Sequence, residues 1–295
     1  MKQLLLVIIA LHPLFMLSQE TSIYDGMDRT YGIEVELVND SVLFSYRVDF
    51  QGSDTTKKYT YKTEALDTFL IILDRDLSIL PAHKNNLLFY IHGMMGGQWL
   101  NLKTTANDLT KFYIAPEKSD VGRLIWIRWP GNLPVYAVDK ENAGLIAPDL
   151  SELLIKITDH VSNIELAHDN RIEVDVLAHS LGSELFKNMY ETMRKTRKCF
   201  GDILFCAPDL DVDVFNEGGP LADLHIVCRQ ATIYHSSKDL TLGCSSKLNN
   251  KGRLGFNGPD TAVISRPEYN FVDMTLVSDE TFLPFKLTGL SLIHI

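Results

Sequence analysis

The chain has 295 residues, of which 45% are hydrophobic and 22% charged, and its formal net charge is −10. This balance is typical of a globular protein with a sizeable core, and the length fits one large α/β domain with an N-terminal addition. The negative charge argues against a nucleic-acid partner, because binding to phosphates requires a basic face.

The first nineteen residues, MKQLLLVIIALHPLFMLSQ, have the pattern of an export signal. Lys2 supplies the positive charge, and residues 4–11 form an uninterrupted apolar run. His12 and Pro13 interrupt this run before it reaches the roughly 20 residues that a membrane-spanning helix needs. We therefore expect residues 1–19 to be removed and the protein to be exported, to the periplasm or the extracellular space. An uncleaved N-terminal anchor is the alternative.

Residues 20–85 are expected to form a β-rich extension followed by a first helix. Residues 33–38 and 41–50 flank a short polar turn, and the second run alternates apolar and polar residues, which predicts a β-hairpin outside the main domain. The hairpin could serve as an edge or as a lid. A helix ending before Pro81 is predicted by apolar residues at helical spacing, namely Leu66, Phe69, Leu70, Leu73 and Leu77.

Residues 86–295 alternate short apolar runs with helical patterns. The predicted strands are residues 87–91, 124–129, 172–178, 202–207, 231–236 and 269–276. Amphipathic patterns predict helices over residues 150–164 and 185–193. Apolar strands separated by helices indicate a parallel sheet that is covered on both faces. The expected fold class is therefore α/β, with a doubly wound, mostly parallel sheet.

The segment AHSLG, residues 178–182, follows the third predicted strand and precedes a helix. It matches the G-x-S-x-G nucleophile elbow, with Ala178 in the first small position, and makes Ser180 the candidate nucleophile. The backbone N–H of Leu181, near the start of the helix, is then a candidate oxyanion donor. The simpler alternative is that Ser180 only caps the helix.

A glycine-rich loop, YIHGMMGG, follows the first core strand at residues 90–97. Gly93 allows a sharp turn, after which the Met94 N–H could point at a substrate carbonyl and supply the second oxyanion donor. A glycine cluster can also be only a flexible loop.

Asp239 lies just after the fifth predicted strand, in YHSSKDLTLG. An acid two strands beyond the nucleophile is suited to orient a catalytic histidine, in the chain order Ser, Asp, His. The alternative role is a helix N-cap, since a short helical segment follows. Asp209 and Asp211, one strand earlier, are lower-ranked candidates for the acid.

Five motifs, in this order, resemble those of a bacterial subfamily of α/β-hydrolases whose members are lipase- or esterase-like proteins of unknown function. They are FYIHGMMGG, WIRWPGNLPVYAVDKENA, VLAHSLGSELF, ILFCAPDLDVDVF and ATIYHSSKDLTL followed by RLGFNG. The resemblance covers residues 86–290. It implies an α/β-hydrolase fold, Ser180 as nucleophile, Asp239 as acid and a histidine after the last strand. It also implies that the W-P-G segment, with Tyr136 and Asp139, lies beside the site.

His294 is the one histidine after the last predicted strand, and it is the candidate base for Ser180. The subfamily usually carries its histidine in a Gly-His-Ser-Tyr-like context, and Leu290, between Gly289 and Ser291, stands at that histidine's position. Two hypotheses follow: His294 is the base, or the C-terminus is truncated near Gly289 and His294 is coincidental.

The four cysteines are Cys199, Cys206, Cys228 and Cys244. They allow three disulfide pairings in an exported protein, although Cys206 lies in an apolar run where a thiol often serves as a small hydrophobe. No C-x-x-C or histidine-rich spacing indicates a metal site, and no cofactor is expected.

The resulting prediction is an exported serine hydrolase that cleaves a small-molecule or lipid carboxylic ester through an acyl-enzyme on Ser180. One alternative is a non-catalytic envelope protein that keeps the hydrolase fold as a binding scaffold. Another is an acyltransferase that uses the same serine.

Overall fold

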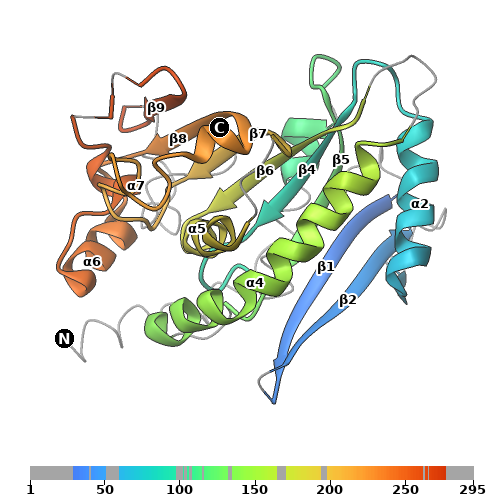
Figure 1. Cartoon of the computed structure of the whole chain (residues 1–295), viewed down its shortest axis with the longest axis horizontal. Helices are drawn as coiled ribbons and strands as arrows, with labels where there is room; N and C mark the ends of the chain where they lie inside the picture. The colour runs from blue at the N-terminus through green and yellow to red at the C-terminus, as the bar shows by residue number, and fades with distance from the viewer. Residues whose placement is uncertain are drawn as a thin grey trace.

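The computed structural model describes residues 29–39, 41–50, 60–97, 102, 105, 108–114, 116–131, 135–164, 171–193, 198–261, 263–264 and 266–276. The expected export signal and His294 lie outside these residues. Within them, nine strands form one sheet in the order β3-β2-β1-β5-β4-β6-β7-β8-β9 (Figure 1). No described helix is long and apolar enough to cross a membrane.

Seven neighbouring strands of the sheet, from β1 to β9 in that order, are parallel. The strands are β1 (Arg29–Val38), β2 (Ser41–Phe50), β3 (Thr60–Glu64), β4 (Asn86–Ile91), β5 (Val121–Arg128), β6 (Glu173–His179), β7 (Phe200–Cys206), β8 (Cys228–His235) and β9 (Tyr269–Asp273). The predicted doubly wound, mostly parallel sheet is confirmed. All six predicted core strands are present, with boundaries shifted by a few residues.

The predicted hairpin is also confirmed, because β1 and β2 pair in antiparallel register on either side of Asn39. Its first strand continues the main sheet: Tyr31–Glu34 pair in parallel with Ile125–Arg128 of β5. β3 then adds an antiparallel strand to the outer side of β2. The hairpin therefore forms an edge of the main sheet rather than a separate unit or a lid.

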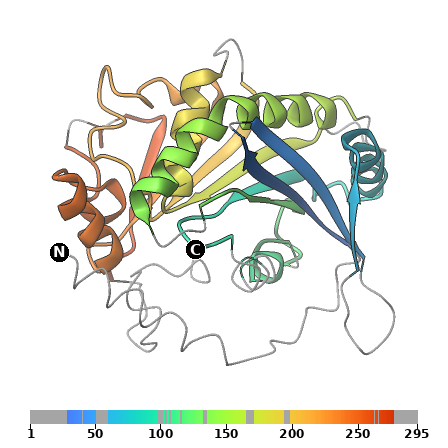
Figure 2. The same cartoon turned by 90° about the horizontal axis from the view of Figure 1, so that it is seen from below.

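Helices cover the sheet on both faces. They are α2 (Leu66–Ser78), α4 (Tyr136–Val161), α5 (Gly182–Thr192), α6 (Leu240–Asn249) and α7 (Leu254–Asn257), with a π-helical turn, η2 (Thr110–Ile114). Figure 2 shows α4 on one side of the sheet and the segment that contains η2 on the other. The sequence placed the start of α4 at residue 150, but the helix begins at Tyr136 and passes through Pro148, because Ala143, Ile146 and Ala147 continue its buried face.

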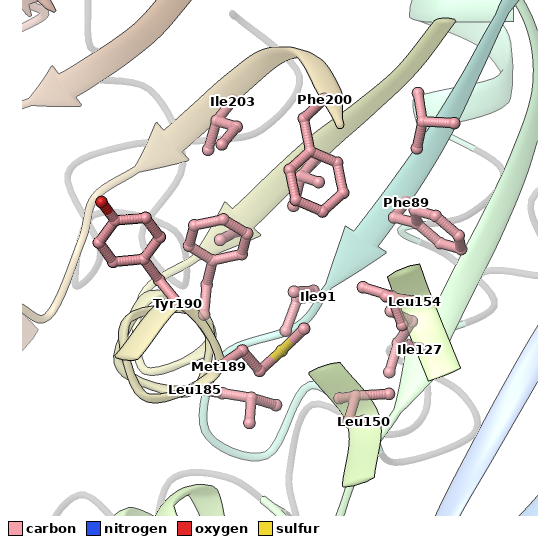
Figure 3. Close-up of a cluster of buried hydrophobic side chains, with 14 of the residues drawn as sticks. Phe89, Ile91, Ile127, Leu150, Leu154, Leu185, Met189, Tyr190, Phe200 and Ile203 are labelled. Carbon is pink, nitrogen blue, oxygen red and sulfur yellow. The ribbon is translucent and has the colours of Figure 1, made fainter. Parts of the chain in front are cut away.

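The main core lies between the sheet, α4 and α5 (Figure 3). The side chains drawn there come from β4 and β5 (Phe89, Ile91, Ile127), from α4 (Leu150, Leu154), from α5 (Leu185, Met189, Tyr190) and from β7 (Phe200, Ile203). Fully burying one such side chain contributes about 1.5–3 kcal/mol. This packing fixes α5 against β4 and β6 and so determines where the turn between β6 and α5 lies.

The four cysteines are free thiols, none joined to another. Cys206 and Cys228 are buried, whereas Cys199 and Cys244 are partly exposed. Burial raises the pKa of Cys228 to about 12, so its thiol stays protonated. Cys206 contacts the core on the η2 side of the sheet, as expected for a thiol that serves as a small hydrophobe.

Candidate active site

Ser180 lies at the carboxyl end of β6, in the turn that leads into α5. Its φ of 50° is in the left-handed region, which a residue other than glycine adopts at a cost of about 1–3 kcal/mol. Three backbone hydrogen bonds hold this conformation. The Ser180 N–H donates to the Cys206 carbonyl at 3.0 Å, and the Ser180 carbonyl accepts from Ser183 at 3.0 Å and from Asp209 at 3.1 Å.

The geometry of the turn does not fit a helix-capping serine. Leu181 occupies the N-cap position of α5, and no side chain caps the helix there. The Ser183 N–H donates to the main-chain carbonyl of Ser180. Within the described part of the chain, the Ser180 hydroxyl makes no hydrogen bond, and the side chain is half-buried. The strained turn therefore presents a hydroxyl without a hydrogen-bond partner at the carboxyl end of β6.

Close backbone contact explains the small residues around Ser180. A Cβ on Gly182 would lie 2.5 Å from the His92 carbonyl oxygen and 2.6 Å from that of Ile91. A Cβ on Gly93 would lie 2.7 Å from the Ser180 Cβ. The loop after β4 and the turn after β6 consequently touch each other through two glycines, because β4 and β6 are neighbours in the sheet.

The backbone amides of Met94 and Leu181 have no hydrogen-bond acceptor among the described residues. The neighbouring amides in the loop after β4 are occupied: the Met95 N–H donates to the Gly131 carbonyl at 2.7 Å, and the Gly96 N–H donates to the Gly93 carbonyl at 3.0 Å. Two such free donors, on loops that touch beside a serine, can stabilise a negatively charged oxygen. The Gly131 contact also shows that the W-P-G segment lies against this loop, as the resemblance implied.

His92 braces the same loop from within the protein. It is fully buried, its Nδ1 lies 2.6 Å from the Gly93 carbonyl oxygen, and its Nε2 accepts the Trp129 N–H at 3.2 Å. Its ring stacks on that of Trp129, with centroids 5.4 Å apart. Burial lowers the pKa of His92 to about 4, so the imidazole is neutral at pH 7. Both of its nitrogens are already engaged in the contacts above. His92 is thus a support for the loop and is not available as a base.

Asp239 follows β8, two strands beyond β6, and is 2% exposed. Its carboxylate accepts the Leu242 N–H at 3.0 Å and caps α6, so the N-cap role expected as an alternative is present. Burial raises the pKa of Asp239 to about 7, and the nearby negative charge of Asp209 adds to the rise. A second backbone hydrogen bond, from Thr241, also reaches this carboxylate. An ionised carboxylate offers about four acceptor sites, so capping and orienting a histidine are compatible.

The two rival acids are engaged by basic groups. Asp209 accepts the Ser245 hydroxyl at 2.7 Å and lies 3.1 Å from Arg253 Nε, and Asp211 contacts both Arg253 and Lys251. No basic group among the described residues lies in ion-pair contact with Asp239. No pattern in the sequence predicted a role for Arg253, because a single arginine in the polar run NNKGRLG has no periodic signal.

The proposed base cannot be placed, since His294 lies outside the described residues. His235 ends β8, where its half-buried ring lies against Gly258. Burial lowers its pKa, and the facing carboxylate of Asp273 opposes that shift. Among the described residues, no histidine is hydrogen-bonded to Asp239, and no group of three or more His, Cys, Asp or Glu is arranged to hold a metal ion.

Comparison with known families gives an independent result. Residues 82–283 match the family described as "alpha/beta hydrolase of unknown function (DUF900)". No curated protein matches the chain. The match spans more than half of the chain and includes every strand from β4 to β9, the turn at Ser180 and Asp239. The suspected superfamily is confirmed, and the chain belongs to this alpha/beta hydrolase family of unknown function.

Proposed function

We propose that this protein is a serine hydrolase that cleaves carboxylic esters through an acyl-enzyme on Ser180. Membership of an alpha/beta hydrolase family supports hydrolytic chemistry in general. The observation that carries the finer proposal is the left-handed backbone of Ser180 with its free hydroxyl, together with the unpaired amides of Met94 and Leu181 on the two loops that touch there. A capping or purely structural serine needs neither the strain nor the free donors.

In the proposed reaction, the Ser180 Oγ attacks the ester carbonyl carbon while a histidine takes the hydroxyl proton. The carbonyl oxygen becomes negatively charged and accepts hydrogen bonds from the Met94 and Leu181 amides. When this intermediate collapses, the histidine returns the proton to the departing alcohol. Water, deprotonated by the same histidine, then releases the acid and restores the serine.

Asp239 is proposed to hold the histidine in the orientation that faces Ser180. A carboxyl with a pKa raised to about 7 by burial changes charge readily near neutral pH. The positive charge that develops on an adjacent imidazole would favour the ionised carboxylate. His294 is the residue that we assign as this base, on the order of the residues along the chain.

The location and substrate class are proposals from the sequence. The pattern of residues 1–19 supports export to the periplasm or the extracellular space. The substrate would then be a small-molecule or lipid ester outside the cytoplasm, and no cofactor is needed for the chemistry.

Labelling with a fluorophosphonate probe tests the proposal, because the probe reacts only with an activated serine. The parent protein should be labelled at Ser180, whereas Ser180→Ala should not be labelled. His294→Ala should be labelled roughly 10⁶-fold more slowly if His294 is the base. A folded parent protein that is not labelled would support the non-catalytic scaffold. Equal labelling of the Ser180→Ala variant would place the nucleophile elsewhere.

A further inference from the structure

Arg253 is one of the largest fully buried side chains of the described protein, with 1% of its surface exposed. Its guanidinium lies against three oxygen-bearing groups. Nε is 3.1 Å from Asp209 Oδ1, Nη1 donates to Asp211 Oδ1, and Nη2 donates to the Tyr136 hydroxyl at 3.4 Å. The Arg253 Nε–H is not aligned with Asp209 for a hydrogen bond, so that contact is an ion pair.

Further polar contacts extend this cluster, which we call the Arg253 network (Tyr136, Asp209, Asp211, Ser245, Asn249 and Arg253). Ser245 donates to Asp209 at 2.7 Å, and Asn249 donates to the Tyr136 hydroxyl at 3.1 Å. A buried guanidinium or carboxylate is costly unless it is paired, and removal of one partner leaves the other charge uncompensated. The network therefore has to form as a unit.

The network joins three segments that are separate in the sequence. Tyr136 begins α4, Ser245 and Asn249 lie on α6, and Asp209 and Asp211 follow β7. Backbone hydrogen bonds continue the connection: the Leu254 N–H donates to the Leu210 carbonyl at 2.8 Å, and the Gly255 N–H donates to that of Pro208 at 3.0 Å. Residues 253–255 are thereby fastened along the segment that follows β7.

Residues 253–255 and the segment after β7 to which they are bonded, here called the strap, are hydrogen-bonded to the backbone around both proposed catalytic side chains. On one side, the Asp209 N–H donates to the Ser180 carbonyl at 3.1 Å, within the strained turn. On the other side, the Ser236 N–H donates to the Gly255 carbonyl at 2.9 Å, and the Asp239 N–H donates to the Ser236 carbonyl at 3.1 Å. Ser180 and Asp239 are thus each one backbone hydrogen bond away from segments that the strap holds together.

We propose that Arg253 is a positioning residue, which fixes the separation and orientation of Ser180 and Asp239 by clamping the segments after β7 and β8 to each other. This inference rests on the proposed function of Ser180. Arg253 is not in contact with Ser180 or Asp239, and it is buried, so it does not meet substrate. Its effect on the reaction is through the placement of other groups. Misplacement of a reacting group by about 1 Å can cost 10²-fold in rate.

The test compares the maximal rate and the half-saturating concentration of fluorophosphonate labelling in four proteins and one matched control. These are the parent, Arg253→Lys, Arg253→Met and the double variant Asp209→Asn with Arg253→Met, which leaves no unpaired charge on Asp209. Arg47→Met is the matched control, because Arg47 also pairs with a buried carboxylate, at 2.7 Å from Glu34, but on β2 at the opposite edge of the sheet. Thermal unfolding shows which variants are folded at the labelling temperature.

For Arg253→Met, we expect the maximal labelling rate to fall roughly 10–100-fold with an unchanged half-saturating concentration. The double variant should be equally slow although it is more stable than Arg253→Met. Arg253→Lys should be intermediate, since an ammonium can pair with Asp209 without also reaching Tyr136. Arg47→Met should lose stability and keep its labelling rate.

Parent-like labelling by folded Arg253→Lys and by the folded double variant would overturn the inference, and so would an equal loss in Arg47→Met. If Arg253→Met does not fold, the labelling rates of Arg253→Lys and of the double variant test the inference. If only Arg253→Lys folds, its labelling rate alone tests the inference. An unlabelled parent protein would instead refute the proposed function, so the two failures can be told apart.

Discussion

Asp239 has two roles in the structure that one pair of substitutions separates. The carboxylate caps α6 through the Leu242 N–H, and it is the acid proposed to orient the catalytic histidine. Asp239→Asn keeps an oxygen that can accept the same hydrogen bond but removes the negative charge. Asp239→Ala removes both. The difference between the two variants therefore measures the cap, and their shared difference from the parent measures the charge.

The expected magnitudes follow from the burial of this side chain. Replacing an N-cap Asp or Asn by Ala costs about 1 kcal/mol, so Asp239→Ala should be less stable than Asp239→Asn by that amount at any pH. A carboxyl whose pKa rises from 3.8 to about 7 on folding disfavours its own ionised form by about 4 kcal/mol. The free energy of unfolding of the parent is therefore unaffected by this carboxyl below pH 4, and it falls by that amount as the pH rises to 7. The free energy of unfolding of Asp239→Asn should therefore rise relative to that of the parent between pH 4 and pH 7, and the difference should remain above pH 7.

Activity should behave differently from stability. Both variants should lose roughly 10⁴-fold in the rate of fluorophosphonate labelling, because a histidine without its carboxylate partner is wrongly oriented. Urea unfolding at pH 4, 6 and 8 gives the stabilities, and labelling at pH 8 gives the rates. Parent-like labelling by a folded Asp239→Asn would show that Asp239 is only a cap and would refute its role as the acid.

Three further predictions concern other features of the structure. Gly182→Ala should cost about 1–3 kcal/mol by differential scanning calorimetry and slow the labelling of Ser180, because its Cβ would meet a carbonyl oxygen at 2.5 Å. The control Gly144→Ala should gain up to about 1 kcal/mol, because its Cβ would lie 3.9 Å from the Asn188 side chain. Ser180→Gly should be about 1 kcal/mol more stable than Ser180→Ala in urea, because only glycine relieves the φ of 50°; equal stabilities would mean that the turn is not strained. Burial raises the pKa of Asp175 to about 6, so the free energy of unfolding of the parent should fall by up to about 3 kcal/mol between pH 4 and pH 7. Asp175→Asn should flatten that pH dependence, and an unchanged slope would exclude Asp175 as its source.

The fold was largely predictable because its central strands, β4, β5 and β6, are buried on both faces. Continuous apolar runs identified β4 and β6, and helical spacing identified α5. The beginning of α4 was not predictable, since Gly144 and Pro148 disfavour a helix in isolation and only packing on the sheet overrides that preference. The position of the hairpin was open for a similar reason: a hairpin pattern specifies its own pairing and not the strand beside it.

The candidate site shows the same division between local and non-local information. The turn at Ser180 has a local pattern, strand, small residue and helix, and Asp239 follows from the order of the strands. The bracing of the loop after β4 by His92 and Trp129 depends on how β4 and β5 lie beside each other. The Arg253 network joins residues that lie up to 117 positions apart, and no spacing in the sequence could bring them together.

Trapping the acyl-enzyme tests the proposed chemistry most directly. The protein would be mixed briefly with an activated p-nitrophenyl ester, quenched in acid, and measured by intact-protein and peptide mass spectrometry. We predict that one acyl group is added to the peptide that contains Ser180, and that Ser180→Ala remains unmodified. A folded parent protein that releases p-nitrophenol without carrying an acyl group on Ser180, or that carries it equally in Ser180→Ala, would contradict an acyl-enzyme on this serine.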